Sequence, residues 1–141
     1  MEIGTIRKIK IGGKVFPLAF PLRAMIEMQN TVEGFDLNDV SKTTKDFSTL
    51  MRMLWILADN GARLEGRKLE EDLDWFTLNT PVNTRKLLAI QLAVINTVAE
   101  WMSMETEEED EWDREVDVVL QEIQKKRQTT DSPGEKSQPG D

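Results

Sequence analysis

The sequence predicts a mainly α-helical protein that begins with a β-hairpin. Its small domain holds three to four helices, and an acidic hinge, one amphipathic helix and a disordered tail follow. Three observations favour this fold: apolar residues recur at helical spacing, a Gly-Gly pair separates two short apolar runs, and the charge changes after Met104. Residues 1–104 contain 13 basic and 13 acidic side chains, whereas residues 105–141 contain 5 and 13 and account for the net charge of −8. We expect a helical body at 1–104, the hinge and helix at 105–127 and the tail at 128–141.

The β-hairpin is expected in the segment TIRKIKIGGKVFPLAF. Gly12-Gly13 tolerates the positive φ angles of a two-residue hairpin turn, and Pro17 indicates an edge strand because proline has no N–H to donate. An isolated hairpin is only marginally stable, so this one should pack against the helices. The apolar residues of its two arms are Ile6, Ile9 and Ile11, then Val15, Phe16 and Leu18.

A first helix is expected directly after the hairpin. Pro21 suits its first turn, because the fixed φ of proline is already helical. The helix should end near Val32, before the stop signal Gly34. The loop EGFDLNDVSKTT follows, with Asp36 or Asn38 as the cap of a short turn.

The second helix should begin at Thr43 or Thr44 and end at Asn60, with Gly61 as its C-cap. Its apolar residues surround most of the helix, which predicts a central, buried position. Three of them are expected either in the core or lining a groove for a partner, namely Met51, Leu54 and Trp55.

Two further helices complete the expected body. The segment LEEDLDWF predicts a short amphipathic helix with Leu69, Leu73 and Phe76 on one side. The last helix of the body should be the longest, entered at Thr80 with Pro81 in its first turn. Its apolar residues form two faces, which predicts a second central helix. One face holds Leu87, Ile90 or Gln91, Val94, Val98, and Trp101 or Met102, and the other holds Leu88, Leu92 and Ile95.

The acidic run ETEEEDEWD, which begins at Glu105, places seven carboxylates within nine residues. A DNA mimic would need carboxylates spread over a rigid surface, and a calcium loop would need glycine and a defined ligand spacing. A crowded charge run is more typical of a solvated, extended segment. We therefore interpret the run as a hinge.

A narrow apolar stripe follows on an otherwise charged helix. The spacing of its members is helical, and they are Trp112, Val116, Val119, Leu120 and Ile123. An isolated helix of about 16 residues is marginally stable in water, so the stripe should find a surface. That surface is either the protein's own body or a groove in a partner or in a second copy of the chain.

The composition argues against an enzyme. The chain contains no histidine, cysteine or tyrosine, which removes the usual general base and the thiolate nucleophile, together with imidazole and thiolate zinc ligands. We expect no catalytic residues, no cofactor and no metal. A metal enzyme with oxygen ligands is the least favoured alternative, and it would need a pocket that gathers Asp59, Glu65, Glu70 or Asp74.

Other features do not alter that expectation. Gly12-Gly13-Lys14 lacks the first glycine and the Ser/Thr of a phosphate-binding loop, and the basic residues of the hairpin are too few for nucleic-acid binding. No apolar run is long enough to cross a membrane, and the first residues hold no apolar stretch of the length that a signal peptide would need. We expect a cytoplasmic protein.

The order of these parts resembles the tail assembly chaperones of long-tailed bacteriophages and prophages. The resemblance covers about residues 3 to 104 and lies in element order and residue character. It rests on the hairpin IKIGGKVFPLAF, the helix PLRAMIEM, the central LMRMLWILADNGA, the segment LEEDLDWF and the closing helix RKLLAIQLAVINTVAEW.

The resemblance implies a small helical chaperone in the bacterial host cell. It would bind the tape-measure protein before tail assembly, with tail tube subunits as a further candidate partner. A partner-specific extension after a common N-terminal domain is also implied, and residues 105–141 fit one. The alternative hypothesis is a small acidic, phage-encoded regulator that blocks a nucleic-acid-binding site, for which the acidic segment would be essential.

Overall fold

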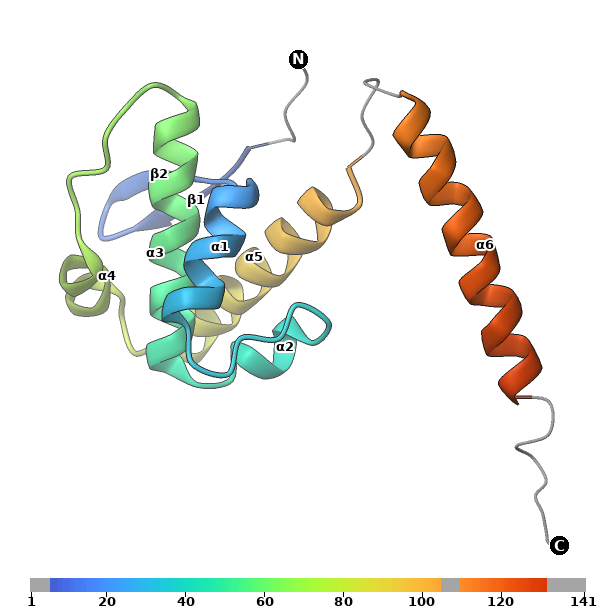
Figure 1. Ribbon diagram of the computed structural model, residues 1–141. Helices are drawn as coiled ribbons and strands as arrows, with labels where there is room; N and C mark the ends of the chain where they lie inside the picture. Colours follow the sequence, from blue (N-terminus) through green and yellow to red (C-terminus); the bar gives the residue numbers. More distant parts are fainter. Residues whose placement is uncertain (1–5, 105–109, 132–141) are drawn as a thin grey trace, which may run out of the picture. The chain divides into compact units, whose positions relative to one another are not determined.

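The computed structural model describes residues 6–104 and 110–131, the last four of these by their backbone alone. The chain divides into two units, residues 1–104 and 105–141. The mainly helical fold with an N-terminal hairpin is confirmed (Figure 1). The first unit contains β1 (Arg7–Ile11), β2 (Lys14–Leu18), α1 (Leu22–Thr31), α2 (Val40–Thr43), α3 (Phe47–Leu64), α4 (Leu73–Asn79) and α5 (Thr84–Met102), and the second contains α6 (Glu111–Asp131).

The predicted hairpin is present with the predicted turn. β1 and β2 pair antiparallel, with Ile11 opposite Lys14, so Gly12 and Gly13 form the two-residue connection. Their φ angles are 57° and 80°, which side chains with a Cβ adopt with difficulty. Pro17 lies opposite Lys8 in this two-stranded sheet, where both strands are edges.

The end of β2 lies directly on α3. The N–H of Ala19 donates to the carbonyl of Leu57, 3.2 Å away, so a strand backbone reaches a helix backbone. This approach needs Gly61, because a Cβ at that position would overlap the carbonyl oxygen of Pro17. The expectation that Gly61 ends the helix is therefore wrong: α3 continues to Leu64, and Gly61 is a contact glycine in its interior.

α3 starts later than the sequence pattern indicates. Thr43 ends the single turn α2, and its successor Thr44 is the C-cap of that turn. Asp46 then begins α3, because its carboxylate accepts the N–H groups of Ser48 and Thr49 at 2.9 and 3.2 Å.

α3 is the central helix of the first unit, as predicted. It packs against β2, α1, α4 and α5 (Figure 1). Leu18, Met28 and Phe76 are fully buried against its apolar residues. Its own buried apolar side chains are Leu50, Met51, Met53, Leu54, Ile56, Leu57, Ala58 and Ala62.

α4 and α5 both begin further along the chain than expected. Residues 69–72 are not helical, because Asp72 caps α4 by accepting the N–H of Trp75 at 2.8 Å. Thr80 does not start α5. Its N–H and hydroxyl both donate to Phe76, which closes α4. The cap of α5 is Asn83, whose side chain accepts the N–H of Lys86 at 3.0 Å.

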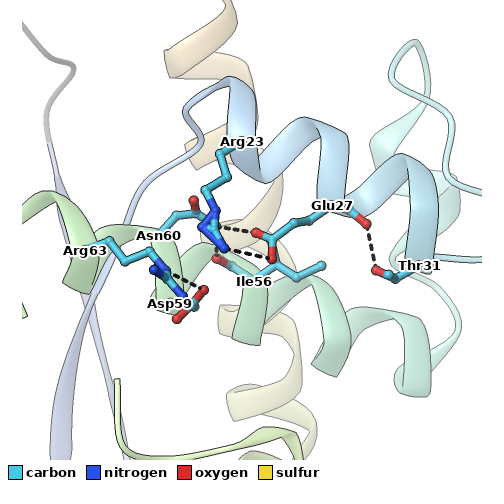
Figure 2. Close-up of polar contacts among 7 residues, drawn as sticks. All are labelled: Arg23, Glu27, Thr31, Ile56, Asp59, Asn60 and Arg63. Atoms are coloured by element: carbon cyan, nitrogen blue, oxygen red, sulfur yellow. Dashed lines mark hydrogen bonds and ion pairs between the residues drawn. The ribbon is translucent and has the colours of Figure 1, made fainter. Parts of the chain in front are cut away.

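A polar seam joins α1 to α3 (Figure 2). The buried amide of Asn60 donates to the carbonyl of Ile56 at 2.8 Å and to the carboxylate of Glu27 at 2.9 Å. Arg23 lies 3.9 Å from the same carboxylate. Because buried amide groups are costly without partners, these bonds fix how α1 lies against α3.

A second polar contact holds the hairpin turn to the segment before α4. The ammonium of Lys14 lies 2.7 Å from the carboxylate of Glu71 and 5.3 Å from the ring centre of Trp75. The hydrogen bond from Lys14 lowers the pKa of Glu71 below its ordinary value of 4.5, against the opposing effect of burial. The indole N–H of Trp55 donates to the carbonyl of Glu71 at 3.0 Å, so the segment is held from both sides.

α6 is a regular helix with a side-chain cap. Asp110 accepts the N–H of Trp112 at 3.0 Å, and Asp113 accepts the N–H of Asp110 at 2.8 Å. The helix reaches Asp131, four residues beyond the end that the sequence pattern indicates at Arg127, so the backbone of 128–131 is not the expected tail. The hinge at 105–109 and the rest of the tail at 132–141 lie outside the described residues.

Gly61→Ala tests the contact between β2 and α3. Helix propensity alone would make this change stabilising by about 0.5–1 kcal/mol. The overlap with Pro17 should instead destabilise the fold by about 1–3 kcal/mol. Urea unfolding followed by far-UV circular dichroism measures the sign, and a variant more stable than the wild type would contradict the contact.

Glu71→Gln tests the Lys14–Glu71 pair through pH. The folded-state pKa of Glu71 is lowered, so its stabilisation is present above pH 4.5 and is lost as the pH falls below that value. The variant should be less stable at neutral pH, and its stability should fall less steeply in acid. Urea unfolding at several pH values measures both effects. Glu70→Gln, which changes an exposed neighbour, is the control, and equal slopes for the two variants would exclude the pair as the cause.

Candidate partner-binding surfaces

α5 has two apolar sides, and only one of them is covered. Ile90, Val94 and Val98 face α3 and are fully buried. The other side is exposed to a large degree: Leu88 is 54% and Leu92 51% exposed. The expectation that α5 is a second central helix is therefore wrong, because no further element among residues 6–104 covers this side.

We call the uncovered side the α5 outer face. Its members recur at alternating intervals of four and three residues, which places them in one line along the helix. They are Leu88, Leu92, Ile95, Ala99 and Met102. No charged residue stands between Leu87 and Ala99, so the line and its flanks are apolar or neutral over this stretch, and Arg85 and Glu100 lie at its two ends.

A groove continues the outer face at the C-terminal end of α5. Residues 37–41 form its second wall, with Leu37 and Val40 half-buried, and its volume is about 440 Å³. Ile95, Ala99 and Met102 belong to both the groove and the outer face. The two features are thus one surface with a flat part and a hollow part.

Local hydrogen bonds hold the second wall of the groove. Asp39 caps α2 by accepting the N–H of Lys42 at 3.2 Å. The buried hydroxyl of Thr43 lies 3.3 Å from the N–H of Asp36, which donates to it. Gln91 donates its side-chain amide to the carbonyl of Thr44 at 3.1 Å, and this bond ties the end of the wall to α5.

Three of the predicted partner-binding residues lie on α3. Met51 and Leu54 are buried in the core, so neither is accessible to a partner in this structure. Trp55 is half-buried and bonded to Glu71. The sequence allowed these residues to be either core or groove lining, and the structure places Met51 and Leu54 in the core.

The other five predicted residues lie on α6 and are exposed. Within the described part of the second unit α6 is the one element, so no other described element of that unit covers the stripe. Val118 is exposed as well, but it lies on a different side of the helix. The stripe consists of Trp112, Val116, Val119, Leu120 and Ile123.

The carboxylates of the first unit are dispersed. Asp59 is buried and lies 3.2 Å from Arg63, and Glu65 lies 2.9 Å from Arg67. Among the described residues no three potential metal ligands come together, so the pocket required by the metal-enzyme alternative is not formed there. The described helices include none that is long and apolar enough to cross a membrane.

The α5 outer face is the surface that sequence reasoning missed. Its signal was present, because Leu88, Leu92 and Ile95 form a second apolar side of the helix. The same pattern is expected for a helix covered on two sides, and periodicity alone does not distinguish the two cases.

Comparison of the chain with protein-family models, with curated proteins and with solved structures gives no match.

Proposed function

We propose that this protein is a non-enzymatic assembly chaperone of long-tailed phages or prophages. It binds the tape-measure protein through apolar helical surface before the tail is built, and tail tube subunits are a further candidate partner. The observation that carries the proposal is the α5 outer face with its groove, an uncovered apolar surface on a well-packed body. The resemblance of the sequence to tail assembly chaperones supplies the identity of the partner.

The dimensions of the surface suit a helix of the partner. From Leu88 to Met102 the outer face spans about 21 Å, which is four turns of helix. Amphipathic helices bind such surfaces through apolar anchors at intervals of three and four residues. The groove beside Met102 then accommodates a larger side chain at one end of the bound helix.

The neutrality of the surface suits a chaperone. Two of the charged side chains of α5 are engaged with β1, since Lys86 donates to the carbonyl of Lys10 and Glu100 pairs with Arg7 at 2.8 Å. The outer face therefore offers contact area with few charges that would select one sequence. Leucine and methionine side chains adapt to different apolar shapes, as transient binding to a long, striped partner requires.

The test is co-expression with the tape-measure protein of the same phage or prophage. Leu88→Ser combined with Leu92→Ser should move that protein from the soluble to the insoluble fraction, because both residues are exposed anchors of the outer face. The fold should be unaffected, which circular dichroism and the urea midpoint check.

Leu78→Ser combined with Val82→Ser is the matched control. These residues are 85% and 96% exposed and do not belong to the outer face. The control should keep the tape-measure protein soluble. If the outer-face variant keeps it equally soluble while its fold is intact, the proposed binding surface is wrong.

A further inference from the structure

The stripe of α6 has the geometry of a coiled-coil seam. Trp112, Val116, Val119 and Ile123 follow one another at intervals of four, three and four residues, which is the a/d pattern of a heptad repeat. All four are about half exposed or more, from 45% at Ile123 to 66% at Trp112. A seam of this kind is complementary to another helix with the same spacing.

The charge of α6 changes sign along its length. Residues 110–117 contain five acidic side chains and one basic, whereas residues 118–127 contain one acidic and three basic. The helix therefore has an acidic first half and a basic second half on either side of the centre of the seam. A partner helix that fits it needs the opposite order of charges.

We propose that a second copy of this chain pairs with α6 in the antiparallel direction. A copy that runs the opposite way supplies the reversed order of charges. Its seam is also in register, because the intervals four, three, four read the same from either end. Trp112 then packs on Ile123 of the second copy, and Val116 packs on Val119 of the second copy.

The parallel alternative fits less well. The next seam position after Ile123 is Lys126, which in a parallel pair meets the same lysine of the other copy inside the seam. The acidic halves would also lie side by side. Two flanking contacts favour the parallel direction. In a parallel pair Glu122 lies near Arg127 of the second copy, which is attractive, whereas in an antiparallel pair Glu115 lies near Glu122 of the second copy, which is repulsive. These contacts are at the solvated edges, where salt screens them, and weigh less than Lys126 in the seam.

The proposal does not depend on the proposed function, because it uses α6 and not the α5 outer face. The seam has four layers, so the association should be weak and should depend on concentration. Part of it is electrostatic, so added salt should weaken it.

Introduced cysteines test the direction of pairing, since the natural chain has none. Full-length Trp112→Cys and Ile123→Cys chains are mixed and oxidised with a mild oxidant. In an antiparallel pair positions 112 and 123 face each other, whereas the two copies of position 112 lie about 16 Å apart along the seam. A disulfide needs Cα atoms within about 7 Å, so the mixed product should form in large excess over either homodimer.

Two measurements complete the test. Gln121→Cys, which lies on the side of α6 away from the seam, is the control and should form little disulfide. Sedimentation velocity of the unsubstituted chain over a wide concentration range should show a monomer–dimer equilibrium that salt shifts towards the monomer. A Trp112→Cys homodimer as abundant as the mixed product would overturn the antiparallel direction. A chain that stays monomeric at every concentration would overturn the proposed pairing.

Discussion

The contact between the backbone of β2 and the backbone of α3 is the constraint on which the first unit depends. A strand usually approaches a helix at the distance set by side chains on both. Here Gly61 removes one layer of side chains, and the N–H of Ala19 bonds directly to the carbonyl of Leu57. Phe16, Leu18 and Phe20 are buried in the same core, so a two-stranded sheet that would be marginal alone becomes part of that core.

This arrangement also determines which surface is left uncovered within the first unit. α3 is surrounded by the hairpin, α1, α4 and α5, and α5 needs only its inner side to complete that core. Two contacts join α5 to β1: Lys86 donates to the carbonyl of Lys10, and Arg7 donates to Glu100. A third contact, from Gln91 to the carbonyl of Thr44, joins α5 to the residue that follows α2. The rotation of α5 is thereby set, and the line from Leu88 to Met102 lies outside the core. Because these contacts hold α5 in one rotation, the apolar line stays exposed in the folded first unit.

The sequence predicts those parts of the fold that local chemistry determines. Gly12-Gly13 favours a tight turn because glycine adopts positive φ angles readily, and the apolar period of residues 47–60 favours a buried helix. Positions where two local signals compete are harder. Thr80 and Asn83 are both suitable caps, and the structure uses the first to close α4 and the second to open α5. The role of Gly61 depends on a residue 44 positions earlier, Pro17, and no local pattern reveals it.

The two candidate surfaces differ in what they can select. The α5 outer face has neutral flanks and a groove, so contact area decides what binds there, and many apolar helices satisfy that requirement. The stripe of α6 has charged flanks whose sign reverses at its centre, so it discriminates between partners and between directions of the same partner. A chaperone for a long apolar partner benefits from a permissive surface, whereas association of identical chains benefits from a selective one. Under the two proposals, the charge distribution therefore favours α5 as the site of the partner and α6 as the site of the second copy.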